Sequence, residues 1–127
     1  MIPVTHDDSL PSRLLKTGHP TAALEWLGRA DGVIRTLGEL TPVASLSLVQ
    51  AFQNAGGVVF AVKVERSVRP GLHDDETREN TGHLVVQVPS EPSRRAKIFQ
   101  LEAKQSKSVG YEPTRDFGQG LLHVKLD

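Results

Sequence analysis

Apolar and polar residues in the first 57 positions follow a helical period. In the strongest of these stretches Thr41 is a capping residue, Pro42 takes the first helical position and Gly56 ends the pattern. A brief turn is expected at 33–37, because its apolar run is too short for a helix. The segments that predict helices lie at residues 10–17, 20–30 and 42–55.

From residue 58 onward the period changes to two, which is typical of half-buried strands. Each alternating segment has one apolar face; in the second, Leu84 and Val86 oppose His83 and Gln87. One apolar face per strand favours an antiparallel sheet that is covered on one side only. The segments that predict strands lie at residues 58–65, 83–88, 98–104 and 122–127.

Helices followed by strands predict an α+β fold. We expect the N-terminal helices to pack on one face of a four-stranded, mainly antiparallel sheet, as a two-layer sandwich. The length of 127 residues suits a single domain, 1–127, with a helical part at 1–57 and a β-sheet part at 58–127. Two long connections, 67–82 and 105–120, are the expected functional or mobile loops, and the shorter link at 89–95 reads as a hairpin turn.

Composition excludes several classes of protein. Fifteen Lys and Arg balance fifteen Asp and Glu, which argues against bulk electrostatic attraction to nucleic acid or anionic lipid. Without cysteine there is no disulfide, thiolate nucleophile or Cys-ligated metal. No apolar run is long enough for a membrane span, and the first residues lack the pattern of a signal peptide. We therefore expect a soluble, cytoplasmic protein with no cofactor, since phosphate-binding glycine loops are also missing.

The two long connections carry the residues typical of a protein interface. Asp74, Asp75 and Glu76 form an acidic group in the first, and the second holds Tyr111, Arg115 and Phe117. The leading hypothesis is a small non-enzymatic binding protein that engages a protein partner with these loops and the exposed sheet face. Small neutral proteins of this kind include bacterial immunity proteins, which inhibit another protein; the analogy is one of class.

The exposed sheet face supports an alternative, a phosphodiesterase-type nuclease that acts on RNA or DNA. His83, Glu102, Lys104 and His123 would share that face if their strands are neighbours. Two imidazoles can act as general acid and base, and a lysine can bind phosphate. A solvated polar face explains the same residues without catalysis, so the order of the strands decides between the two interpretations.

The tripeptide Glu102-Ala103-Lys104 resembles the Glu-x-Lys half-motif of restriction-endonuclease-like nucleases. The resemblance covers these residues alone and implies a carboxylate that helps to bind a divalent ion beside a lysine that stabilises charge on phosphate. The same pattern is common on solvent-exposed strands. A third hypothesis is self-association through an exposed edge or face of the sheet.

Overall fold

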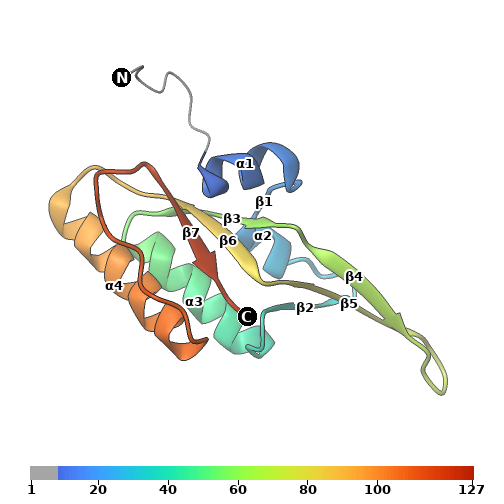
Figure 1. The fold of residues 1–127 in the computed structure, drawn as a ribbon. Coiled ribbons are helices and arrows are strands. Elements are labelled where there is room, and N and C mark those ends of the chain that lie inside the picture. Colours follow the sequence, from blue (N-terminus) through green and yellow to red (C-terminus); the bar gives the residue numbers. More distant parts are fainter. Residues whose placement is uncertain (1–8) are drawn as a thin grey trace.

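The computed structural model of the chain describes residues 9–127, and this part contains four helices and two sheets (Figure 1). The combination of helices with a four-stranded antiparallel sheet confirms the predicted α+β class. The helices are α1 (Leu10–Thr17), α2 (Ala23–Leu27), α3 (Pro42–Asn54) and α4 (Pro92–Ser108). The strands are β1 (Thr21–Ala22), β2 (Ile34–Leu37), β3 (Val58–Val62), β4 (Glu65–Arg69), β5 (Glu76–Thr81), β6 (His83–Gln87) and β7 (Leu121–Lys125).

The two sheets share one long hairpin. The four-stranded sheet has the order β1-β3-β6-β7 with every neighbouring pair antiparallel. The three-stranded sheet has the order β2-β5-β4, in which β2 runs parallel to β5 and β4 runs antiparallel to it. Since β4 directly follows β3 and β6 directly follows β5, the same two chain segments pass through both sheets. We call β4, β5 and the connecting residues 70–75 the arm.

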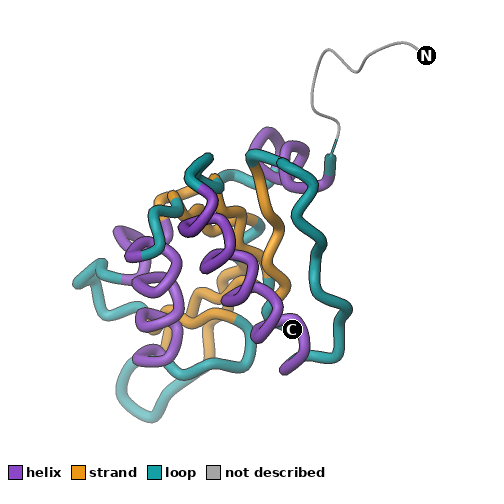
Figure 2. Tube along the Cα trace, turned by 90° about the vertical axis from the view of Figure 1, so that its left-hand side faces the viewer, coloured by secondary structure: helices purple, strands orange, loops and turns teal. Residues whose placement is uncertain are grey.

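The main core lies between the four-stranded sheet and helices α2, α3 and α4. Figure 2 shows α3 and α4 side by side over the strands. Helix α1 lies on the opposite face, where Leu14 packs against Val62 and Val85. The predicted two-layer packing is therefore not confirmed. The core side chains that the sheet and helices bury most completely are Trp26, Leu37, Val49, Phe52, Val59, Ala61, Leu84, Val86, Ile98, Leu122 and Val124.

Helix predictions are confirmed where a cap and a stop signal flank the pattern. Helix α1 has the predicted bounds, and the Thr41 hydroxyl caps α3 by accepting a hydrogen bond from the Ala44 amide at 3.1 Å. The predicted helix at 20–30 is wrong at both ends, because Thr21 and Ala22 pair with β3 and only α2 remains helical. The expected turn at 33–37 is strand β2.

The predicted strand at 98–104 is wrong, because these residues lie within α4. Phe99, Leu101 and Ala103 alternate as in a strand, but the positions that α4 buries recur at helical spacing: Ile98, Phe99, Glu102 and Ser106. The predicted turn at 89–95 is also wrong, because it contains the start of α4. There the Glu91 carboxylate caps the helix by accepting hydrogen bonds from two backbone amides.

The predicted strand at 58–65 ends early, at Val62. Val59 and Ala61 point into the main core, whereas Val58 is half exposed. At Lys63 the backbone has a φ of 54°, a left-handed conformation that interrupts the strand between β3 and β4. The predicted loop at 67–82 is also wrong, since most of β4 and all of β5 fall within it.

Candidate functional site

The outer strand and the tip of the arm are exposed to solvent. All five residues of β4 are exposed, and no described strand pairs with its outer edge. At the tip, Leu72 keeps 94% of its surface accessible. Figure 1 shows the arm projecting away from the helices. A two-stranded ribbon of this kind needs support at its base to hold one conformation.

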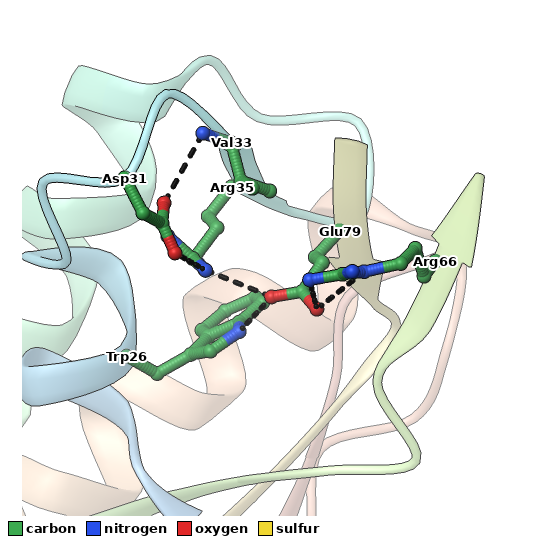
Figure 3. A network of polar contacts seen from close by, with 6 residues as sticks. All are labelled: Trp26, Asp31, Val33, Arg35, Arg66 and Glu79. Carbon is green, nitrogen blue, oxygen red and sulfur yellow. Dashed lines mark hydrogen bonds and ion pairs between the residues drawn. The ribbon is translucent and has the colours of Figure 1, made fainter. Parts of the chain in front are cut away.

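Arg35 provides that support from β2. Its side chain is only 2% exposed, and its guanidinium forms a two-pronged ion pair with Asp31 at 2.8 and 2.7 Å (Figure 3). The Arg35 Nε also donates to Glu79 on β5 at 2.8 Å. These hydrogen bonds from Arg35, together with one from the Val33 amide, hold the pKa of Asp31 well below its usual range. The buried guanidinium thus joins the parallel strands β2 and β5.

Glu79 is the centre of the network. Its carboxylate accepts hydrogen bonds from the Trp26 indole at 3.0 Å and from Arg66 at 3.2 Å, besides that from Arg35 (Figure 3). Burial raises the pKa of Glu79, but the hydrogen bonds from Trp26 and Arg35 outweigh it and lower the pKa below its ordinary value. Glu79 therefore stays charged and fixes the base of the arm to α2, β2 and β4.

The acidic residues predicted for binding lie at the outer end of the arm. Glu76 begins β5 and pairs with Arg78 at 2.9 Å, which lowers the pKa of the carboxyl. Asp74 and Asp75 are exposed, and within residues 9–127 neither takes part in an ion pair. These two carboxylates therefore take no part in the ion pairs that hold the base of the arm.

A second candidate site lies on the sheet face that α1 partly covers. Because β6 and β7 are neighbours, His83 and His123 come together as diagonal neighbours on that face. The Nδ1 of His83 lies 2.9 Å from the Nε2 of His123, and the stacked rings have centroids 5.2 Å apart. The two histidines therefore share a sheet face, as the sequence predicts for the case in which their strands are neighbours.

The histidine pair lies in a positive environment. Burial lowers the pKa of His123 to about 4, and the charges of His83, Lys125 and Lys63 add to the effect. Burial also lowers the pKa of His83, with Asp127 opposing and Lys63 and Lys125 adding to the shift. His123 is therefore neutral near pH 7, where one imidazole donates its N–H to the other.

His123 lines a cavity of about 260 Å³ between β7, the residues that follow α4 and the start of α1. Lys125 and Tyr111 also line this cavity, and the Lys125 amine lies 4.1 Å from the centre of the Tyr111 ring. The remaining lining combines polar residues with Pro11 and Phe117: Ser9, Ser106, Glu112, Thr114 and Gln119.

Glu102 and Lys104 do not join the histidines on a shared sheet face. Glu102 is buried on α4, where its carboxylate accepts hydrogen bonds from the Ser106 hydroxyl at 2.6 Å and the Thr114 amide at 3.0 Å. It thereby anchors the connection that follows the helix. Lys104 is exposed and lines a different groove, between α3 and α4. The Glu-x-Lys pattern lies on a helix, not on the strand that the nuclease resemblance requires.

Tyr111, Arg115 and Phe117 lie in the loop 109–120, which connects α4 to β7. All three are exposed, and Phe117 keeps 80% of its surface accessible. In Figure 1 this loop and the tip of the arm lie at opposite ends of the molecule. The residues predicted for binding thus form two separate surfaces instead of one.

Two further findings concern residues 9–127. No group of three or more His, Asp or Glu side chains is arranged to hold a metal ion in this part. None of its helices combines the length and apolar character of a membrane span.

A comparison with protein-family models, curated proteins and solved structures found no significant match. The arm and the histidine pair are the features of the chain that bear on its function.

Sequence reasoning missed Arg35 and Trp26, which hold the arm. Arg35 is flanked by Ile34 and Leu37 in a short apolar run, and a lone charge in such a run is a signal of a buried, paired group. Trp26 is 1% exposed, and a buried indole N–H needs an acceptor. That requirement indicates a polar partner such as Glu79.

Replacing Arg35 with methionine should destabilise the protein by about 3 kcal/mol, because Glu79 and Asp31 lose their shared cation. The matched control is Arg66→Met, which should cost less than about 1 kcal/mol since the Arg66 side chain is 59% exposed. Urea unfolding at pH 7 measures both. Equal losses for the two variants would contradict the role of Arg35.

Protonation of His123 should make stability depend on pH. In the unfolded chain this histidine protonates below about pH 6.5, but in the folded protein it stays neutral down to about pH 4. The free energy of unfolding should therefore fall as the pH drops through this window, by about 1–2 kcal/mol after allowing for solvent screening. Urea unfolding at pH 7, 6 and 5 should show a smaller slope for His123→Gln than for the wild type. An unchanged slope would contradict the burial of this ring.

Proposed function

We propose that this protein is a small non-enzymatic binding protein that engages a protein partner with the tip of its arm. The observation that carries the proposal is an exposed ribbon whose base is fixed by a buried ion-pair network. Fixing the ribbon before binding reduces the entropy that association costs. By analogy of class, the partner's activity would be inhibited in the cytoplasm, as with immunity proteins.

The chemistry of the tip suggests the kind of partner. Leu72 offers an exposed apolar side chain, and Asp74 and Asp75 offer unpaired carboxylates next to it. A complementary surface would combine a shallow apolar pocket with arginine or lysine side chains. The loop 109–120, at the other end of the molecule, would then serve a separate contact.

The test is a triple variant, L72S/D74K/D75K. Since all three side chains are exposed, the melting temperature should stay within a few degrees of the wild type. Partners captured by the wild type would be purified, and their affinity measured by calorimetry. We expect a loss of at least about tenfold in the variant.

The matched control changes charge away from the arm, at the exposed Lys97 on α4, through Lys97→Glu. Partners that bind the arm variant and the wild type equally well would contradict the proposal.

The histidine contact favours a second candidate function, a phosphodiesterase-type nuclease. One imidazole of the pair could remove a proton from the attacking oxygen, which is the 2′-hydroxyl in RNA or a water molecule in DNA, while a protonated group delivers one to the leaving oxygen. Lys125 and Lys63 supply positive charge near the pair. This version of the hypothesis uses His83, His123 and Lys125, and gives Glu102 a structural role.

If the second candidate is right, the protein should cleave RNA or DNA at low concentration, and His123→Ala should abolish cleavage while the circular dichroism spectrum is unchanged. The arm variant L72S/D74K/D75K serves as the control, because it should cut as well as the wild type. A clean preparation that cuts neither polymer, with or without magnesium, excludes this function.

A further inference from the structure

The outer edge of β4 has a charge pattern that is complementary to itself. Glu65 and Arg69 lie at the two ends of the strand with Ser67 midway, and all three side chains share one face. Neither Glu65 nor Arg69 forms an ion pair within residues 9–127. The backbone groups on this edge have no partner strand in the described chain.

We infer that β4 pairs antiparallel with β4 of a second copy of this chain, about a two-fold axis at Ser67. Glu65 of each copy then lies opposite Arg69 of the other, which gives two attractive pairs across the axis. Such an interface is isologous, as in most symmetric dimers. The three-stranded sheet of one copy would continue into that of its partner.

Other registers are worse. An axis at Arg66 places the two Arg66 side chains directly opposite each other and brings Lys63 against Arg69. An axis between Ser67 and Val68 is excluded, because the opposed side chains would then lie on opposite faces of the joined sheet. An axis at Val68 brings Pro70, which has no amide hydrogen, into the ladder. Charged residues on an edge strand discourage pairing with most other strands. Here the charges permit pairing with a second β4 about the axis at Ser67.

This inference does not depend on the protein partner proposed above, because that partner engages the tip and the second copy engages the edge. Each copy keeps Leu72, Asp74 and Asp75 outside the Ser67-centred pairing. Failure of one proposal would therefore leave the other standing.

The charge pairs are tested by a swap. Sedimentation equilibrium on the full chain should show concentration-dependent dimers of the wild type that weaken at high salt. Glu65→Arg and Arg69→Glu each place like charges opposite each other, so each should raise the dimer dissociation constant at least about tenfold. The double variant E65R/R69E reverses both pairs and should restore the wild-type constant. Each variant is checked for folding by its melting temperature.

A monomer at every concentration would overturn the inference, whether or not another protein binds the edge. Single variants that dimerise like the wild type, or a double variant that fails to recover, would also overturn it.

The axis itself is tested by a cross-link, which the absence of cysteine makes unambiguous. Directly opposed residues in an antiparallel pair have Cα atoms about 4.5–5.5 Å apart, within the range of a disulfide. On mild oxidation with diamide, Ser67→Cys should form a disulfide-linked dimer. The control Ser47→Cys, exposed on α3, should not. Equal cross-linking of the two variants, or none at position 67, would place the contact elsewhere and overturn the assignment.

Discussion

A buried guanidinium is the constraint on which the arrangement of the two sheets depends. Arg35 cannot be taken from water without compensation, so Asp31 and Glu79 must both be in place when the protein folds. Those two carboxylates belong to a turn and to a strand that lies 44 residues away from Arg35 in sequence. Satisfying one charge therefore brings the helical half of the chain and the arm together. The indole of Trp26 extends the same requirement into the main core.

The histidine pair and the arm are connected through one chain segment. Strands β5 and β6 are separated only by Gly82, so Glu79 and His83 lie on the same continuous stretch. A side chain at Gly82 would meet the Asp127 carboxylate, whose charge acts on His83. The Thr81 hydroxyl, at the end of β5, donates a hydrogen bond to the carbonyl of Val62, the last residue of β3. This junction fixes the direction of the arm relative to the histidines.

Helices α1 and α3 and strands β6 and β7 could be predicted from the sequence, because periodicity and capping act locally. Helices α1 and α3 follow from Ser9, Thr41 and the glycines that end them. The inward faces of β6 and β7 follow from Leu84, Val86, Leu122 and Val124, and so does the shared face of the two histidines. Their direct contact depends on strand order, which is a long-range property.

The errors have physical causes of two kinds. Over 98–104 the alternation of Phe99, Leu101 and Ala103 imitates a strand, although the helix buries a different set of positions. The capping signal at Glu91 favours the helix. In the arm, charged residues occupy both faces of β4, so the sequence shows no alternation of apolar and polar residues. This segment is a strand because it pairs with β5. The pairing of Arg35 with Glu79 is a tertiary contact between residues 44 positions apart, so the local pattern does not identify this partner.

The exposure of β4 on both faces has a consequence for evolution. Substitutions in that strand remove no buried contact, so they should accumulate at little cost to folding. Substitutions elsewhere, which remove packed core contacts or leave the buried charge of Arg35 unpaired, should cost far more. Related chains could therefore keep the same scaffold while the sequence of the ribbon diverges, and a family descended from this fold could acquire new specificities one exposed side chain at a time.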